Sequence, residues 1–299
     1  MGNTIQISRM AQTSSEVGPE VSSALQPEVD RYFHERADVW KQYYEATTLK
    51  ARVYQARKDR ALAWIDDLKL AAGSPMLEVG CGAGFTTLSL ASRGYEVTAF
   101  DSVSTMLDLT RQAASDLGLK NQVRTALGDV HRLQFRDGEF MLVIALGVLP
   151  WLHSPQRAIQ EIKRVLRPGG YALLTVDNAW RLSYVLDPMQ CPLLQGLRGA
   201  VSRSLRTLRL KRYPPEPKLS RRHSPQQLDS AVTAAGLTKI CGATVGFGPF
   251  TFLDRPLLSD ANGTRLHQKL QGLADEGFPL LESMGSHYVV LARAPQQQQ

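Results

Sequence analysis

The sequence has few cysteines and no long hydrophobic run. Its three cysteines, Cys81, Cys191 and Cys241, are widely spaced and form no C-x-x-C pair. Neither a disulfide framework nor a zinc site is therefore expected, no other metal is expected, and the compartment should be reducing. The longest apolar run, residues 140–152, is shorter than the ~20 residues that cross a bilayer. No secretory signal is evident at the N-terminus, so we expect a cytoplasmic protein.

Outside one segment the sequence also lacks a net positive charge. The formal net charge is +7, yet residues 198–222 hold nine Lys or Arg and a single acid, Glu216, which leaves the rest of the chain at about −1. Binding of nucleic acid along the whole surface is therefore not expected. The basic segment has a leucine stripe at helical spacing, and three interpretations stay open: a lid packed on the domain, a helix in peripheral contact with an anionic membrane, and a helix that holds an acidic substrate.

The length and the breakers in the sequence predict one large α/β domain with added segments. We expect a disordered N-terminus at 1–27, an N-terminal helical cap at 28–72, a core at 73–177, a basic lid segment at 178–222, and the remainder of the core at 223–295 with an insertion at 246–286. Strands are predicted near 76–79, 95–100, 122–127, 140–146, 171–176, 237–245 and 287–292. Helical patterns between them favour a seven-stranded, mostly parallel sheet with helices on both faces.

The stretch around which the chain is organised is Met-Leu-Glu-Val-Gly-Cys-Gly-Ala-Gly at residues 76–84. An apolar strand leads into three alternating glycines, and a helix begins at Phe85, an arrangement that can hold a nucleotide-type cofactor. A dinucleotide fingerprint would need glycine where Phe85 stands. Glu78, two residues before the first glycine, would repel a pyrophosphate and suit a cationic ligand. A purely structural turn is the alternative.

This acidic-x-Gly-x-Gly-x-Gly pattern resembles the first motif of class I S-adenosylmethionine (SAM) dependent methyltransferases. Four further stretches over residues 76–176 match that family in order and spacing: Asp101 after the second strand, Gly-Asp-Val at 128–130, the strand and exit loop at 140–153, and Arg-Pro-Gly-Gly at 167–170. The small-molecule branch that includes the ubiquinone and menaquinone methyltransferases is the most similar. The resemblance implies a Rossmann-like fold and SAM as the methyl donor.

The resemblance also implies the residues that bind SAM. Asp101 would accept hydrogen bonds from the ribose, Asp129 from the adenine amino group, and Val130 would pack nearby. The full implied set is Glu78, Gly80, Cys81, Gly82, Gly84, Asp101, Ser102, Gly128, Asp129, Val130, Ala145 and Leu146. For Asp101 a helix cap, and for Asp129 a turn, are the alternatives.

The reaction needs little from the protein, because a sulfonium methyl group is already activated. Alignment of donor and acceptor can supply roughly 7 to 11 kcal/mol of the acceleration. An oxygen or carbon acceptor must also lose a proton, and His153 is the first candidate base since it follows the fourth strand. Tyr43, Tyr44 and Asp177 are weaker candidates, and a helix-start role for His153 is the alternative. His287 is expected to be structural.

The predicted function is methyl transfer to an oxygen or carbon of a small or lipid-like metabolite. Two alternatives remain open: an RNA or protein methyltransferase that uses residues 198–222, and a partner subunit with no turnover of its own. The motif Asn/Asp-Pro-Pro-Tyr, which accompanies methylation of amino groups in nucleic acids, is missing from the fourth strand. Nucleic acid is therefore not the expected partner.

Overall fold

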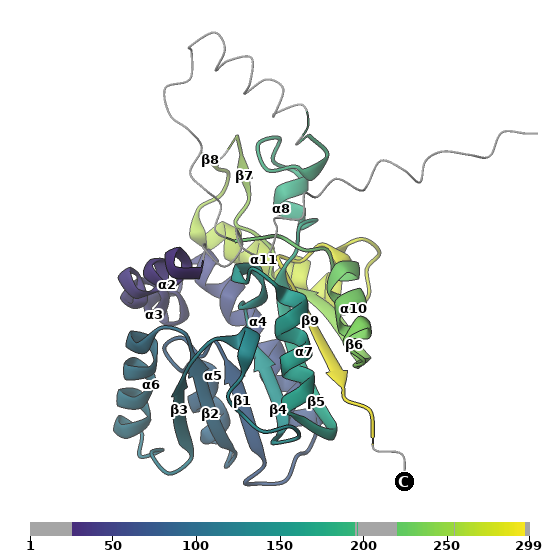
Figure 1. Cartoon of the computed structure of the whole chain (residues 1–299). Coiled ribbons are helices and arrows are strands. Elements are labelled where there is room, and N and C mark those ends of the chain that lie inside the picture. Colours follow the sequence, from purple (N-terminus) through teal and green to yellow (C-terminus); the bar gives the residue numbers. More distant parts are fainter. Residues whose placement is uncertain (1–25, 195, 197–219, 254, 297–299) are drawn as a thin grey trace, which may run out of the picture.

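A computed structural model describes residues 26–194, 196, 220–253 and 255–296 (Figure 1). Almost all of the expected disordered N-terminus at 1–27 lies outside the described residues. So does most of the basic segment at 198–222, of which only the last residues are described. The lid or membrane role of that segment therefore stays a prediction.

The core is one seven-stranded sheet, in the order β3-β2-β1-β4-β5-β9-β6. Its strands are β1 (Pro75–Val79), β2 (Glu96–Asp101), β3 (Val123–Leu127), β4 (Phe140–Ala145), β5 (Leu166–Asp177), β6 (Thr238–Val245) and β9 (His287–Arg293). Strands β1 to β5 pair in parallel, and only β9 runs antiparallel to both of its neighbours, β5 and β6. The predicted mostly parallel sheet is confirmed.

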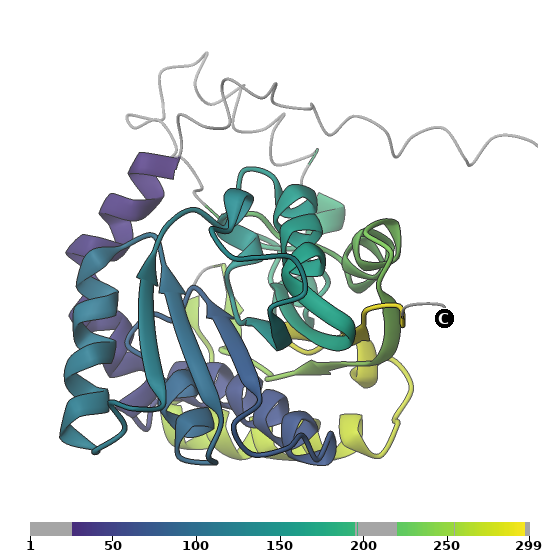
Figure 2. The same ribbon diagram turned by 60° about the horizontal axis from the view of Figure 1, so that its bottom comes forward.

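Helices cover both faces of this sheet (Figure 2). They are α2 (Gln26–Glu35), α3 (Ala37–Glu45), α4 (Leu49–Asp67), α5 (Phe85–Ala91), α6 (Ser104–Asp116), α7 (Pro155–Val165), α8 (Leu182–Val185), α10 (Pro225–Ala234) and α11 (Asp260–Asp275). Alternate residues of β4 belong to two separate cores: Val143 packs with α7 and α10, and Leu142 with α4 and α5. Burial on both faces explains why the strands are continuously apolar in the sequence.

Two helical predictions change in detail. The predicted helical region at 28–72 is three helices, and the longest begins where Thr48 accepts a hydrogen bond from the backbone N–H of Ala51. The residue pattern of 265–274 within the insertion predicts a helix there, but α11 begins earlier, since Ser259 caps it by accepting from the backbone N–H of Asn262. Both caps are the Ser/Thr type that satisfies free N–H groups of the first turn.

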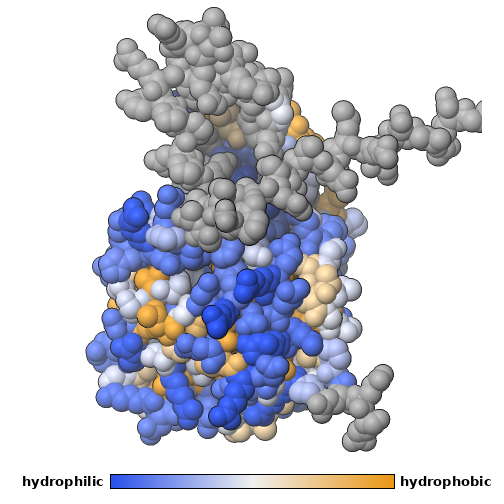
Figure 3. Space-filling model, in the orientation of Figure 1, coloured by the Kyte–Doolittle hydropathy of each residue, from blue (hydrophilic) through white to orange (hydrophobic). Residues whose placement is uncertain are grey.

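Several segments gather beyond the carboxyl ends of the parallel strands, above the sheet in Figure 1. These are α2, α3, α8 and a small hairpin of β7 (Thr251–Phe252) and β8 (Arg255–Pro256). Ligands of open α/β sheets bind at this edge, so the added segments surround the expected site. The described part of the face seen in Figure 3 is mostly hydrophilic, with smaller hydrophobic areas among the hydrophilic residues. None of the described helices has both the length and the hydropathy that a membrane crossing needs.

Candidate active site

The glycine turn after β1 adopts a backbone shape that other residues rarely take. Gly80, Gly82 and Gly84 have φ values of +66°, +54° and +84°. The backbone N–H groups of Gly80 and Cys81 both donate to the carbonyl of Phe100 on β2, which fixes the start of the turn. A Cβ at Gly80 would overlap the side chain of Val148. Glycine is therefore required here by both conformation and space.

Glu78 is a buried carboxyl group at the end of β1. Its side chain accepts a hydrogen bond from the Thr87 hydroxyl in α5. Burial raises the pKa of Glu78 to about 7, although hydrogen bonds from Thr87 and Thr86 act in the opposite direction. A cation bound nearby would favour the ionised form. The site therefore holds an acid poised to respond to positive charge.

Asp101 connects the glycine turn to the next helix. One carboxylate oxygen accepts from the backbone N–H of Gly82, and the other from that of Val103, each at 3.0 Å. Burial raises the pKa of Asp101, and these two hydrogen bonds oppose that rise. Each oxygen has a further lone pair. The side chain can thus hold the turn in place and still accept from a ligand.

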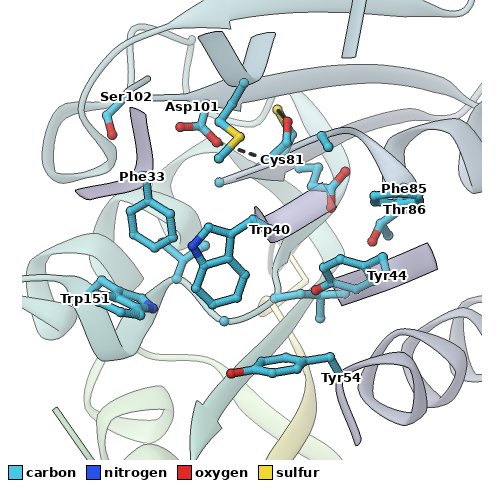
Figure 4. A pocket seen from close by; sticks show the side chains of 18 of the residues that line it. Phe33, Trp40, Tyr44, Tyr54, Cys81, Phe85, Thr86, Asp101, Ser102 and Trp151 are labelled. Carbon is cyan, nitrogen blue, oxygen red and sulfur yellow. Dashed lines mark hydrogen bonds between the residues drawn. The ribbon is translucent and has the colours of Figure 1, made fainter. Parts of the chain in front are cut away.

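A first cavity of about 160 Å³ opens above this turn. Its floor includes Glu78, Gly82 and Asp101, and its roof comes from the aromatic side chains of the N-terminal helices and the loop after β4. Figure 4 shows these rings, from Phe33, Trp40, Tyr44, Tyr54 and Trp151, gathered opposite Asp101 and Cys81. Tyr44 also stacks on Phe85, with 5.1 Å between ring centroids.

A second cavity of about 480 Å³ adjoins the first. The two share four lining residues: Trp40, Tyr54, Trp151 and Asp177. The second cavity is additionally lined by Lys50, Arg181, Tyr184, Arg222 and His287. The shared lining places the two cavities next to each other at the carboxyl edge of the sheet.

Asp177 and His287 form a hydrogen-bonded pair in this wall. Nδ1 of His287 lies 3.1 Å from Oδ1 of Asp177. Burial alone would raise the pKa of Asp177, but the hydrogen bond from His287 and the charges of Arg181 and Arg57 outweigh it and lower that pKa to about 2. Burial lowers the pKa of His287, so the imidazole is neutral at pH 7. Because Nδ1 must then donate to the carboxylate, Nε2 carries the lone pair.

Comparison with known proteins shows which protein family has a similar sequence. Residues 77–174 match the family described as "Methyltransferase domain". The chain carries a class I SAM-dependent methyltransferase domain. Malonyl-[acyl-carrier protein] O-methyltransferase of Geobacter sulfurreducens is 35% identical over 120 residues, which cover 39% of this chain and 45% of that protein. Escherichia coli K12 tRNA 5-carboxymethoxyuridine methyltransferase is 30% identical over 156 residues, covering 50% of this chain and 58% of that protein.

Among solved structures, magnesium protoporphyrin IX methyltransferase from Synechocystis PCC 6803, with bound SAH, has the same fold. The TM-score is 0.58 at 15% identity, over 90% of this chain and 99% of that one. The matches to the two curated relatives span about half of their lengths. These similarities therefore support a SAM-dependent methyltransferase domain. They do not identify the methyl acceptor, for which the geometry of the site is the evidence.

The methyltransferase domain brings together only part of the set predicted to bind SAM. The predicted residues that line the first cavity are Glu78, Gly80, Cys81, Gly82, Asp101, Ser102 and Leu146. Gly84, Gly128, Asp129, Val130 and Ala145 do not line it. The carboxylate of Asp129 instead accepts from the backbone N–H and from Nδ1 of His131, at 2.9 and 2.6 Å.

His153 lies apart from the two cavities. Its ring stacks on that of His131 with 3.7 Å between centroids, and it lines neither the first nor the second cavity. Burial lowers the pKa of His153. Of the other candidate bases, Tyr44 lines the first cavity and Asp177 lines both. His287, for which the sequence predicts a structural role, lies beside the shared wall and lines the second cavity.

Arg57 is a site residue that sequence reasoning missed. Its side chain is only 5% exposed and lines the first cavity. Nη2 donates to the Tyr44 hydroxyl at 2.7 Å, and Nε has no hydrogen-bond partner among the described residues. The signal was present, since Arg57 lies four residues from both Val53 and Ala61 on the buried stripe of α4. A charged residue on a buried stripe is rarely there for packing alone.

Proposed function

We propose that this protein transfers the methyl group of SAM, bound in the first cavity, to an oxygen or carbon of a small or amphipathic acceptor in the second cavity. The observation that carries the proposal is the wall of Trp40, Tyr54, Trp151 and Asp177 that lines both cavities. Because these four residues border both cavities, a donor in the first and an acceptor in the second would lie next to each other. Such alignment is the main requirement of a reaction whose donor is already activated.

The chemistry of the first cavity fits SAM at three points. The carboxyl group of Glu78 suits a ligand that carries positive charge on its ammonium and sulfonium groups. Asp101 retains lone pairs for the ribose hydroxyls. The buried guanidinium of Arg57 suits the SAM carboxylate, because a buried cation with an unused N–H group is costly until an anion pairs with it. The roles of Gly84, Gly128, Asp129, Val130 and Ala145 remain predictions.

The first cavity is small for a cofactor of this size, since ligand sites of drug-sized molecules occupy roughly 300 to 1,000 Å³. Val29 of α2 and Trp40 of α3 belong to its lining, so these helices cover the glycine turn. We infer that α2 and α3 move outward when SAM enters. Their return over the bound cofactor would exclude water from the reacting atoms.

His287 is proposed as the general base in place of His153. The acceptor would give its proton to Nε2 of His287 as its oxygen or carbon forms the new bond to the methyl carbon. The bond from that carbon to the sulfonium sulfur breaks in the same displacement, and S-adenosylhomocysteine leaves with the bonding electron pair. Asp177 would stabilise the imidazolium formed on His287, as a carboxylate does for histidine bases in general.

The test has a binding part and a turnover part. Calorimetry of the folded protein should show binding of SAM and of S-adenosylhomocysteine, and binding of neither would contradict the proposal. Labelled SAM incubated with the protein and a metabolite and lipid extract should then give a labelled small molecule, identified by mass spectrometry. Binding without any labelled product would favour the non-catalytic subunit instead.

An RNA acceptor is the second candidate, because one relative is named for a tRNA nucleoside. The described end of the basic segment, with Ser220 and Arg222, borders the second cavity, so a nucleotide could be presented there. Label should then appear in RNA, and binding should weaken steeply with salt as counterions compete for the phosphates. RNA binding that is absent, or that does not change with salt, would exclude this candidate.

A further inference from the structure

We propose that exposed apolar side chains after α8 and on the β7–β8 hairpin bind the surface of a lipid bilayer that contains anionic lipid. The inference goes beyond the proposed function and starts from large apolar side chains that the fold leaves in water. Six of them, which we call the apolar tip, are between 46% and 75% exposed: Leu186, Met189, Leu193, Phe252, Leu253 and Leu257. A single exposed leucine is common on any protein, but a group of such residues marks a surface that something else covers.

A buried carboxylate joins the two elements that carry the apolar tip. Asp187, directly after Leu186, accepts from the backbone N–H groups of Met189 and Leu253, at 2.9 and 3.1 Å. It also accepts from the hydroxyl of Thr251 on β7. Figure 1 shows α8 and the hairpin above the sheet. The exposed side chains of both elements therefore belong to one end of the molecule.

Packing of the core does not explain the apolar residues of the hairpin. Strands β7 and β8 form a two-stranded sheet of their own, and such a hairpin is marginally stable in water. Its base is held by Phe250, which is buried in a cluster with Phe247. Beyond that base, residues 252, 253 and 255–258 are all exposed. These side chains are therefore available to a partner outside the chain.

Charge favours an anionic lipid surface over an uncharged one. In the sequence, residues 198–222 begin five residues after Leu193 and hold nine Lys or Arg and one acid. The hairpin adds no net charge, because Asp254 and Arg255 cancel. Asp187 is buried, so its carboxylate is shielded from a bound surface. Basic residues beside exposed apolar ones are what an interfacial binding surface presents to anionic headgroups.

The composition of the apolar tip favours lipid over a protein partner. Residues that dominate protein interfaces are mostly Trp, Tyr and Arg that fill matching pockets, and leucine is under-represented among them. The apolar tip has one ring, that of Phe252, beside four leucines and a methionine. Hydrocarbon accepts apolar side chains without a matching pocket, so these residues suit the boundary between headgroups and acyl chains.

The same two elements form part of the wall of the second cavity. Ser183 and Tyr184 of α8 and Thr251 of β7 line it. Binding of the apolar tip to a bilayer would therefore hold the second cavity next to the lipid. An amphipathic acceptor dissolved in the bilayer can then enter the cavity without passing through bulk water. This consequence for the acceptor rests on the proposed function, whereas the binding to lipid does not.

Vesicle binding tests the surface directly. The full-length protein is sedimented with unilamellar vesicles of phosphatidylcholine alone, or of phosphatidylcholine mixed with phosphatidylserine. The mixed vesicles should bind the protein more tightly by roughly tenfold or more. Added salt should weaken that binding, because it screens the charges. Absence of binding to the mixed vesicles would overturn the inference.

Variants locate the binding surface. Phe252→Ser and Leu257→Ser should each weaken binding to the mixed vesicles by roughly three- to tenfold, the effect of withdrawing one partly inserted side chain. The effects should multiply in the double variant. Leu117→Ser is the matched control, because Leu117 is 63% exposed but ends α6, at the opposite, amino edge of the sheet. It should bind vesicles like the wild type.

Thermal unfolding shows whether these variants keep the fold. All three side chains are exposed, so the Tm of each variant should stay near that of the wild type. If the double variant kept the vesicle binding of the wild type, charge alone would explain that binding and the inference would be overturned. Equal loss of binding in Leu117→Ser would overturn it as well, because the effect would then not be specific to the apolar tip.

Two other occupants of the apolar tip would give different results. If a second copy of this chain covered it, the wild type would sediment as a dimer without lipid, the double variant as a monomer, and vesicles would not bind. If an acidic protein covered it, polyglutamate would bind where vesicles do not. Either result would overturn the inference. Calorimetry with S-adenosylhomocysteine is done separately: no binding of that ligand, with vesicle binding intact, would overturn only the proposed function.

Discussion

Nδ1 of His287 lies 3.1 Å from Oδ1 of Asp177, in the register pair that joins the first residue of β9 to the last residue of β5. Both residues stand at the carboxyl edge of the sheet because β9 is the one antiparallel strand among its neighbours. The carboxylate fixes the proton of the neutral imidazole on Nδ1. Nε2 is left buried and without a hydrogen-bond partner among the described residues, beside the second cavity.

A first prediction follows for turnover. His287→Gln should lower kcat by roughly 10²- to 10⁴-fold, the usual contribution of a general base, while SAM still binds. His153→Gln should keep most of the activity, because His153 lines neither cavity. Single-turnover assays with labelled SAM measure both variants. If His153→Gln were inactive and His287→Gln active, the general base would be His153, as the sequence predicts.

The pH dependence gives a second prediction. Burial lowers the pKa of His287 from its ordinary value of 6.5. The rate should therefore rise with pH through a midpoint below 6.5 and then level off, since only neutral His287 accepts a proton. The folded protein also binds fewer protons here than the unfolded chain, so stability should decline as the pH falls below about 6.5. The acidic limb of the kcat/KM profile should disappear in the residual activity of His287→Gln; a limb that persists would assign it to another group.

The sequence predicted the mostly parallel sheet and the glycine turn because both follow from local patterns. The run from β1 into Gly80, the carboxylate of Asp101 and the alternation of strands and helices can all be read within short windows. The pairing of Asp177 with His287 cannot, since it depends on which strand reverses in the sheet. Arg57 was missed for a different reason: its partner Tyr44 lies in a separate helix, so the meaning of a buried arginine appears only when α3 and α4 are packed together.

Arg57 carries a third prediction. Arg57→Met should weaken SAM binding by roughly 10- to 100-fold, the value of a buried charge-assisted pair. Binding of 5′-methylthioadenosine, which lacks the amino-acid carboxylate, should change little. Arg60→Met, on the same helix but in an exposed ion pair with Asp275, is the control and should bind both ligands normally. Equal losses for SAM and methylthioadenosine in Arg57→Met would mean that the variant has lost the shape of the cavity, not a carboxylate contact.

Glu78 gives a fourth prediction, on proton release. Its pKa of about 7 without SAM means that the carboxyl group is partly protonated at neutral pH. A bound cation lowers that pKa, so SAM binding at pH 7 should release a fraction of a proton. Titrations in buffers of different ionisation enthalpy measure it. Glu78→Gln should bind SAM more weakly by about tenfold and should release no proton from this position. If proton release were unchanged in that variant, Glu78 would not be its source.

The glycine turn gives the last prediction, on stability. Gly80 and Gly82 have similar positive φ values, +66° and +54°, but a Cβ at Gly80 would overlap Val148 and one at Gly82 would meet no atom within 4 Å. Gly82→Ala should therefore cost only the left-handed backbone, about 1 to 2 kcal/mol. Gly80→Ala should lower the stability further, because its Cβ also overlaps Val148. Adding Val148→Ala to this variant should recover that additional loss but not the backbone cost. Thermal unfolding without SAM measures all three variants and the double variant. If Gly80→Ala and Gly82→Ala were equally stable, overlap with Val148 would not explain why glycine is needed at position 80.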